Sequence, residues 1–380
     1  MSSFVVPARY LRAAVEDDLR QRMVFIGGPR QVGKTTFAQA LLPSYRPGHP
    51  AYLNWDDPVS RERLLNRQWP ASEPLIILDE VHKYARWRNL LKGLYDTFKG
   101  QHRFLVTGSA RLDVYRRGGD SLLGRYHYHR MHPLSLPELG HAAGAVDALL
   151  RFGGFPEPFL RQSERTLRRW HLERLSRIVR EDLVDLERVR ELSLVERLAE
   201  ALPERVGSPL SVKHLARQLE VDFKTARHWI EILERLYFCF RIPPFGATKI
   251  RAVKKEQKLY LWDWSQVASP GARLENLVAS HLLKWCHYLE DTEGYRMELR
   301  FLRDVDRREL DFVVLRDRKP LFAVECKAGE RELSPHIPYF AARTPIPTFY
   351  QVHLGSTERT PMRGVHILPL EALCRREGLV

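Results

Sequence analysis

A glycine-rich turn at residues 28–35 constrains the fold of this 380-residue chain more than any other feature of its sequence. The turn reads Gly28-x-x-x-x-Gly33-Lys34-Thr35, with the apolar run "MVFIGG" before it and the helix-like "KTTFAQALL" after it. Between a buried strand and a helix, this spacing is typical of a phosphate-binding loop, in which backbone N–H groups surround the phosphates, the lysine reaches the β- and γ-phosphate oxygens, and the hydroxyl holds Mg²⁺. The pattern predicts a site for ATP and Mg²⁺ built from Gly28, Pro29, Arg30, Gln31, Val32, Gly33, Lys34, Thr35 and Thr36.

A second apolar run, "PLIILDE", ends in the acidic pair Asp79 and Glu80. Ligands of parallel sheets bind beyond the carboxyl ends of the strands, so this pair is expected beside the phosphates. Asp79 is then predicted to join Thr35 in holding Mg²⁺. Glu80 is predicted to orient and polarise the water that attacks the γ-phosphate.

A third apolar run, "HRFLVTGSA", ends in the hydroxyl side chains of Thr107 and Ser109. At the end of a buried strand beside the nucleotide, either hydroxyl could sense the γ-phosphate, and a simple turn after the strand is the alternative. Between the second and third runs, the spacing of apolar residues over 85–100 predicts a crossover helix.

The order of these elements resembles the AAA-like (AAA+ superfamily) P-loop ATPase module over about residues 20–139. The resemblance implies a Walker A motif at the glycine-rich turn, a Walker B motif at Asp79 and Glu80, and a polar sensor at the end of the third strand. Related ATPases often take an arginine from a neighbouring subunit to stabilise the charge of the transition state. Arg111 and Arg125 are the candidates here, and an arginine supplied in trans would require a homo-oligomer.

The middle of the chain is rich in Arg, Glu and Leu and predicts a helical lid or connector over residues 146–205. Two helical patterns follow in "SVKHLARQLEVDFKTARHWIEILERL", separated by a short turn, with Ser211 as the cap of the first. They resemble a winged helix-turn-helix, and the lysine-rich residues 249–258 have the place of a basic wing. The resemblance implies DNA contacts by Lys224, Thr225, Arg227, His228, Lys254 and Lys255, with Lys258 in the same wing. A winged helix that only packs between domains is the alternative.

Two apolar runs in the C-terminal part, "RELDFVVLRDRKPLFAVECK", predict a β-hairpin. Asp311 then falls opposite Glu325, and Lys327 shares the face of Glu325 because residues two apart on a strand point the same way. With Glu275 on a preceding helix, the arrangement resembles the PD-(D/E)xK restriction-endonuclease-like domain over about residues 274–352. The resemblance implies Mg²⁺ held by Asp311 and Glu325, Lys327 as the catalytic lysine and Glu275 as an accessory acid. Both DNA cleavage and DNA binding without cleavage stay open.

The charge balance favours a polyanionic partner such as DNA, since 61 Lys and Arg against 47 Asp and Glu give a formal net charge of +14. The four cysteines form no CxxC pair, and no apolar run approaches the roughly 18 residues that cross a bilayer. The first residues show no secretion pattern. We therefore expect a cytoplasmic protein with no membrane partner.

Together these features predict an α/β chain in four parts. The parts are a P-loop NTPase parallel-sheet domain over 1–145, a helical connector over 146–205, a winged helix-turn-helix over 206–258 and an α/β restriction-endonuclease-like domain over 259–380. Two functions fit this organisation. One is an ATPase that acts on or with DNA as a motor or switch, and the other is a regulatory ATP-binding switch whose C-terminal domains bind proteins and not DNA.

Overall fold

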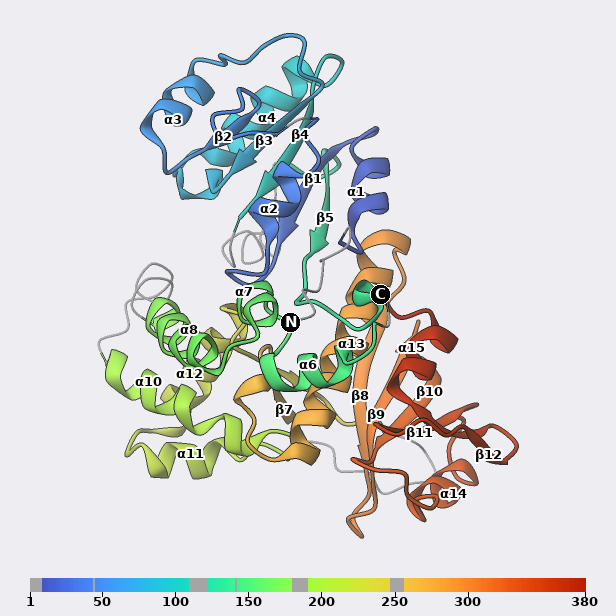
Figure 1. Cartoon of the computed structure of the whole chain (residues 1–380). Coiled ribbons are helices and arrows are strands. Elements are labelled where there is room, and N and C mark those ends of the chain that lie inside the picture. The colour runs from blue at the N-terminus through green and yellow to red at the C-terminus, as the bar shows by residue number, and fades with distance from the viewer. Residues whose placement is uncertain (1–8, 44, 109–121, 141, 180–190, 247–255) are drawn as a thin grey trace. The chain divides into compact units, whose positions relative to one another are not determined.

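The computed structural model describes residues 9–43, 45–108, 122–140, 142–179, 191–246 and 256–380 (Figure 1). The described residues up to Pro133 form one compact unit, and those from Leu134 to Val380 form a second. Each unit has its own sheet and its own core, so each is described by itself.

The first unit is built on a five-stranded sheet in the order β2-β3-β4-β1-β5, in which every neighbouring pair is parallel. All residues of β1 and of β3 are buried, which is the pattern of a parallel sheet covered on both faces. This sheet confirms the predicted parallel P-loop NTPase-like domain. Its strands are β1 (Met23–Gly27), β2 (Tyr52–Asn54), β3 (Leu75–Asp79), β4 (Arg103–Thr107) and β5 (Tyr126–Arg130).

Helices connect β1 to β2, β2 to β3 and β3 to β4, as parallel pairing requires. The predicted crossover helix between the second and third apolar runs is α4, which buries Trp87, Leu91 and Leu94. Asp57, in the turn after β2, caps α3 by accepting a hydrogen bond from the Ser60 backbone N–H. Among its described residues, the helices of this unit are α1 (Arg12–Asp18), α2 (Lys34–Gln39), α3 (Pro58–Leu65), the 3₁₀ helix η1 (Val81–Lys83) and α4 (Trp87–Phe98).

The second unit begins with a helical region and a small hairpin. Ser211 and Asp222 accept backbone hydrogen bonds at the starts of α11 and α12, which gives the two-helix pattern expected from the sequence. An antiparallel pair, β6 (Cys239–Ile242) and β7 (Lys258–Leu261), follows them. The helices are η2 (Pro137–Leu139), α6 (Ala145–Phe152), α7 (Pro156–Arg161), α8 (Glu164–Arg177), α10 (Leu192–Ala201), η4 (Pro203–Arg205), α11 (Val212–Gln218), α12 (Phe223–Arg235) and η5 (Trp264–Gln266).

A six-stranded mixed sheet, in the order β12-β13-β11-β10-β9-β8, forms the rest of the second unit. The predicted hairpin is β9 and β10, joined by Asp317 and Arg318, both with positive φ as a two-residue hairpin turn requires. The strands are β8 (Met297–Arg303), β9 (Glu309–Arg316), β10 (Lys319–Cys326), β11 (Phe349–His353), β12 (Arg359–Met362) and β13 (Val365–Pro369). The helices are α13 (Pro270–Glu293), α14 (His336–Ala341) and α15 (Leu370–Glu377).

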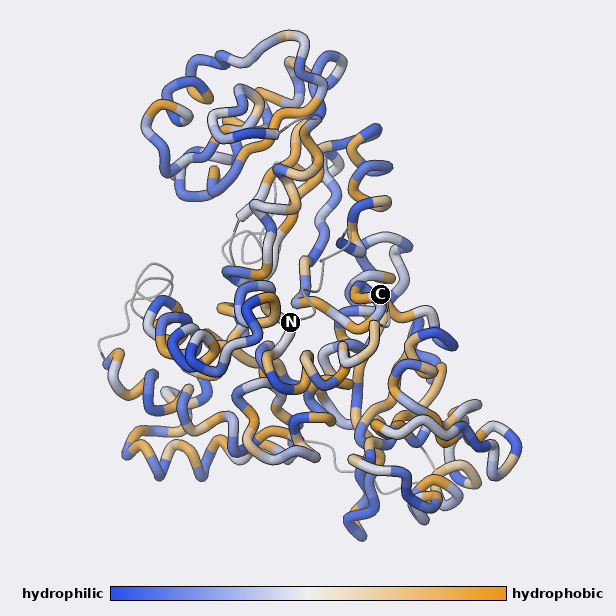
Figure 2. The backbone as a smooth tube through the Cα atoms, viewed as in Figure 1, coloured by the Kyte–Doolittle hydropathy of each residue, from blue (hydrophilic) through white to orange (hydrophobic). Residues whose placement is uncertain are grey.

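Hydrophobic residues dominate β1, β3 and β4, whereas β5 and α8 are largely hydrophilic (Figure 2). None of the helices in the described ranges has the length and apolar character needed to span a bilayer.

Candidate functional site

The turn between β1 and α2 has the backbone of a phosphate-binding loop. Gly28 has a φ of 138°, and a Cβ there would collide with the carbonyl oxygen of Met131, so only glycine fits. Gly33 has a φ of 97° and starts α2. The Lys34 ammonium donates to the carbonyl oxygens of Gly28, at 3.0 Å, and of Pro29, at 2.7 Å. The Lys34 side chain therefore lies across the inside of the turn in which the phosphates are expected to bind.

Asp79, at the carboxyl end of β3, joins the loop to the neighbouring strand. The Thr35 hydroxyl donates to its Oδ2 at 2.9 Å, and the Thr107 hydroxyl donates to its Oδ1. Register explains the meeting, because Asp79 pairs with Thr107 and Thr107 pairs with Ile26, one residue before the end of β1. A hydroxyl and a carboxylate side by side are the hard oxygen ligands that Mg²⁺ prefers, so Thr35 and Asp79 fit the ion that the sequence implies.

Glu80 has a left-handed backbone, with φ at 57°, which costs a non-glycine residue about 1–2 kcal/mol. Its N–H donates to the Thr107 carbonyl at 3.0 Å, which fixes this turn against β4. Its carboxylate lies 3.4 Å from the Lys83 ammonium and 3.6 Å from the His82 ring. Burial raises the pKa of Glu80, and the adjacent charge of Asp79 adds to the rise while Lys83 opposes it. Glu80 is therefore a strained residue held at the carboxyl edge of the sheet.

Two residues of this site have no signal in the sequence. The Tyr52 hydroxyl, from β2, donates to Asp79 Oδ2 at 2.6 Å, and burial followed by the charge of Asp79 raises the pKa of Tyr52. The buried guanidinium of Arg9 donates to the carbonyl oxygen of Val32 at 2.7 Å and also to that of His132. Arg9 therefore ties the phosphate loop to the segment after β5.

The remaining predicted residues of the first unit are placed as follows. Pro29 and Val32 are buried, Arg30 and Gln31 are half-buried, and Thr36 is exposed.

Arg125 precedes β5 at the edge of the sheet where the strands begin, whereas the loop follows the other end of β1. The five residue steps from Arg125 to Arg130, which lies opposite Gly27, put it about 16 Å from the end of β1 at which the loop begins. Its guanidinium makes a two-bonded ion pair with Asp96 of α4, at 2.9 Å and 3.1 Å. It is therefore placed away from the phosphate loop of its own chain. Ser109 and Arg111 lie outside the described residues.

The two-helix segment carries the predicted DNA-contacting residues on one helix. Lys224, Arg227 and His228 are exposed on α12, and Thr225 is half-buried beside the capping Asp222. Arg227 pairs with Glu231 at 2.9 Å on the same helix. Lys254 and Lys255 lie outside the described residues. The prediction that Lys258 belongs to a basic wing is wrong. Its side chain is buried and its ammonium lies beside the carboxylates of Glu275, Glu309 and Asp311.

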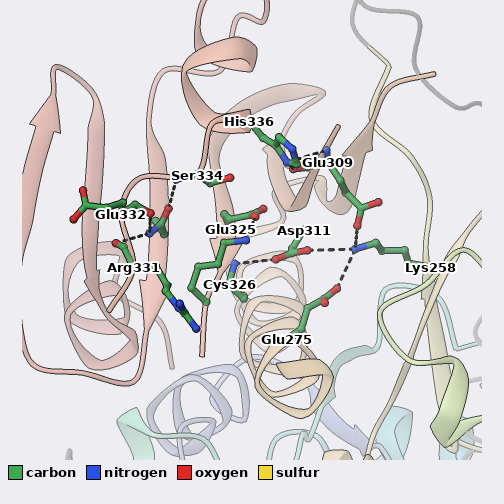
Figure 3. A network of polar contacts seen from close by, with 12 residues as sticks. Lys258, Glu275, Glu309, Asp311, Glu325, Cys326, Arg331, Glu332, Ser334 and His336 are labelled. Carbon is green, nitrogen blue, oxygen red and sulfur yellow. Dashed lines mark hydrogen bonds and ion pairs between the residues drawn. The ribbon is translucent and has the colours of Figure 1, made fainter. Parts of the chain in front are cut away.

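The four residues predicted for the nuclease-like centre do meet. The β9–β10 register pairs Phe312 with Val324, so Asp311 and Glu325 come next along the ladder. The Lys327 ammonium donates to Glu325 Oε1 at 2.6 Å, and Glu275 of α13 lies at the same place (Figure 3). Burial, and then the charge of Asp311, raise the pKa of Glu275 to about 7 and that of Glu325 to about 8.

The ammonium of Lys258 lies beside two of these carboxylates, those of Glu275 and Asp311, and beside that of Glu309 (Figure 3). Within the part of the chain that the structure describes, no three or more His, Cys, Asp or Glu side chains are arranged to hold a metal ion. The Lys258 ammonium already places a positive charge beside Asp311.

The parallel sheet and its phosphate loop define the first unit as a P-loop NTPase-like domain. Residues 20–140 match the family model of the AAA domain. Residues 144–269 and 270–373 match two domains of unknown function, DUF8612 and DUF4143.

Among curated proteins, the chain is similar to the uncharacterized proteins Rv2008c of Mycobacterium tuberculosis and Mb2031c of Mycobacterium bovis. Each is 27% identical over 246 residues, which cover 64% of this chain and 55% of the relative. The chain therefore spans little more than half the length of these mycobacterial proteins. The uncharacterized protein MJ1544 of Methanocaldococcus jannaschii is 24% identical over 341 residues, covering 79% of this chain and 73% of its own.

Among solved structures, the chain is similar to the RuvB Holliday junction branch migration motor of Thermotoga maritima, with a TM-score of 0.30. Their identity is 18%, over 61% of this chain and 87% of that one. It is also similar to the STAND protein PH0952 of Pyrococcus horikoshii, with a TM-score of 0.24 and 12% identity, over 76% of this chain and 48% of that one. Both TM-scores are too low to indicate a shared arrangement of the whole chain.

Proposed function

We propose that this protein is a Mg²⁺-dependent ATPase whose nucleotide cycle acts on or with DNA. The observation that carries the ATPase half is the contact of Asp79 with Thr35, at the start of α2, and with Thr107, where Asp79 and Thr107 end the neighbouring parallel strands β3 and β4 and Glu80 follows Asp79. Steady-state ATP hydrolysis by the purified chain, with and without duplex DNA, tests the proposal.

The side chains have separate roles in this proposal. Bound at Thr35 and Asp79, Mg²⁺ would neutralise phosphate charge. Lys34 gives up its hydrogen bonds to the carbonyl oxygens of Gly28 and Pro29 and binds the β- and γ-phosphate oxygens instead. Glu80 orients the attacking water and takes its proton. Thr107 holds Asp79 in place from β4, which makes it a positioning residue.

An arginine from a second copy of the chain would complete this site in trans. The Arg125 side chain is only partly exposed and is paired with Asp96, so it would have to leave this ion pair to reach a neighbouring subunit. Arg111 is the other candidate.

The DNA half rests on charge. The exposed cations of the two-helix segment lie on α11 and α12, and the chain as a whole carries a formal net charge of +14. An exposed helix start with clustered Lys and Arg is the arrangement that binds phosphate backbones and enters the major groove. The cations are Lys213, Arg217, Lys224, Arg227 and Arg235, and the exposed imidazole of His228 lies on the same helix as the last three.

Reversing two of these charges, with Lys224→Glu and Arg227→Glu together, is expected to weaken duplex binding at least about tenfold. The slope of log affinity against log salt should fall by about two, because each lost phosphate contact removes about one released counterion. Fluorescence anisotropy of a labelled duplex across a salt series measures both quantities.

The matched control is Arg168→Glu with Arg169→Glu, which makes the same change in net charge on exposed residues of α8. Both pairs weakening the binding equally would indicate net charge alone. Unchanged affinity in the Lys224 and Arg227 variant would leave the two-helix segment as a packing element.

A second function is favoured by one observation. Phe223, the first residue of α12, is 50% exposed, and a large exposed aromatic side chain is typical of a protein interface. A regulatory ATP-binding switch whose C-terminal unit binds a protein would use this face. Turnover that ignores DNA would support it.

A further inference from the structure

The first side chain of β7, Lys258, ends at the centre of an acidic cluster. Its ammonium lies 3.0 Å from Glu275 Oε1, 2.5 Å from Glu309 Oε1 and 3.4 Å from Asp311 Oδ1 (Figure 3). A lysine ammonium has three donors, and three carboxylates surround it here. The cluster is therefore arranged around this one cation.

Burial makes these contacts decisive. Lys258 has no exposed surface, and a buried charge is tolerated only where partners replace its water. Burial alone would lower the pKa of Lys258, but the charges of Asp311, Glu275 and Glu309 outweigh it and raise the pKa above its ordinary value. The lysine is therefore held as a cation by its three carboxylate partners.

The backbone holds Lys258 from three directions. Lys258 pairs with Ile242 in the β6–β7 ladder, it bridges to Pro209, and the carbonyl of the preceding Gln257 accepts the N–H of Leu210. Gly207 closes the other side, because a Cβ there would come within 2.9 Å of Glu275 Oε2. A swing of the side chain out of the cluster would have to break this packing.

The carboxylates also have further donors. Asp311 Oδ2 accepts the Cys326 backbone N–H at 2.8 Å, and Glu275 Oε1 accepts the Tyr260 hydroxyl at 2.7 Å. Glu309 Oε2 lies 3.3 Å from Arg303. Mg²⁺ demands near-octahedral oxygen coordination at about 2.0–2.1 Å, which one or two carboxylates and several waters usually supply. An ammonium has no lone pair to offer and repels a second cation. With its Oδ1 facing the Lys258 ammonium and its Oδ2 on the Cys326 N–H, Asp311 offers no oxygen to such a shell.

We infer that Lys258 is the resident cation of this acidic cluster, that the C-terminal unit therefore holds no divalent cation there, and that it does not hydrolyse phosphodiester bonds. The cluster serves instead to fasten β7, at the end of the two-helix segment, to α13 and β9 of the C-terminal sheet. This disagrees with the Mg²⁺ site that the nuclease resemblance implies. The inference is independent of the ATPase proposal, because the two sites share no residue.

The test is a Mn²⁺ titration without nucleotide, read by electron paramagnetic resonance of the free ion. Four full-length proteins are compared: wild type, Asp311→Asn, Lys258→Met and the Lys258→Met, Asp311→Asn double variant. Any Mn²⁺ bound at the phosphate loop is common to all four. Wild type and Asp311→Asn are expected to bind the same number of ions. Lys258→Met is expected to bind one more, and the double variant to lose that ion.

Loss of a Mn²⁺ site in Asp311→Asn relative to wild type would overturn the inference, and this arm stands even if Lys258→Met fails to fold. A folded Lys258→Met that gains no ion would also overturn it, because the ammonium would then not stand where a divalent cation fits. A plasmid assay in Mg²⁺ and in Mn²⁺ tests the chemistry separately. Wild type is expected to leave the DNA intact, and cleavage that Asp311→Asn abolishes would refute the inference.

Discussion

Replacing Lys34 with alanine is expected to lower kcat/KM for ATP hydrolysis by about 10²- to 10³-fold, the loss typical of one preorganised donor at a transition state. The Lys34 ammonium lies inside the turn, where it contacts the carbonyl oxygens of Gly28 and Pro29. In the proposed complex with ATP, the same ammonium is expected to reach the β- and γ-phosphates. Alanine keeps the helix propensity of the first residue of α2, so the loss falls on phosphate contacts and not on the fold. Phosphate release measured over a range of ATP concentrations gives the value.

Lys92→Ala is the matched control, since Lys92 is an exposed lysine on α4 of the same domain. Its turnover should equal that of the wild type. Hydrolysis by Lys34→Ala at the wild-type rate would mean that ATP is hydrolysed elsewhere on the chain or by a contaminant.

Replacing Glu80 with glutamine is expected to leave ATP binding intact and to lower kcat by about 10²- to 10⁴-fold, the usual contribution of a general base. Glutamine has nearly the same shape, and the backbone hydrogen bond from residue 80 to Thr107 is kept, so the turn should not move. The amide lacks the charge that polarises water and accepts its proton. A fluorescent ATP analogue measures the dissociation constant, and phosphate release measures kcat.

Glu62→Gln makes the same chemical change at an exposed site on α3 and should leave both quantities unchanged. If Glu80→Gln turned over ATP normally, the water would have to be oriented by another residue. If it bound ATP poorly, the effect would be on binding and the assignment of Glu80 to the chemical step would be wrong.

Local pattern was enough to predict most elements of the first unit. The apolar runs that end in Asp79 and Thr107 are β3 and β4, and the turn with Lys34 joins β1 to α2. The parallel arrangement followed from helices between strands. The sequence did not predict the contacts of Tyr52 with Asp79 and of Arg9 with Val32. The partners in these hydrogen bonds are 27 and 23 residues apart, respectively. Contacts at that separation depend on the order of strands in the sheet, which no local pattern contains.

The acidic cluster of the C-terminal sheet also combines residues that a local pattern predicts with one that it does not. The alternation of side chains along a strand and the two-residue turn were enough to predict that Asp311 and Glu325 lie together. Both features belong to one hairpin, so they can be read from a short stretch of sequence. Lys258 was assigned to a basic wing by the lysines before it, whereas the structure buries it among Glu275, Glu309 and Asp311. A run of lysines says nothing of which one meets carboxylates that follow 17 and 53 residues later.

ATP hydrolysis measured with Mg²⁺ in the presence and absence of duplex DNA tests the central claim most directly. We predict Mg²⁺-dependent turnover that rises with DNA, and a rise that shrinks as salt increases from about 50 mM to about 200 mM, because phosphate contacts weaken with counterion concentration. The Lys224→Glu, Arg227→Glu variant should keep the DNA-independent rate and lose the rise. Turnover that is identical with and without DNA at every salt concentration would contradict the DNA half of the proposal, and no turnover at all would contradict its ATPase half.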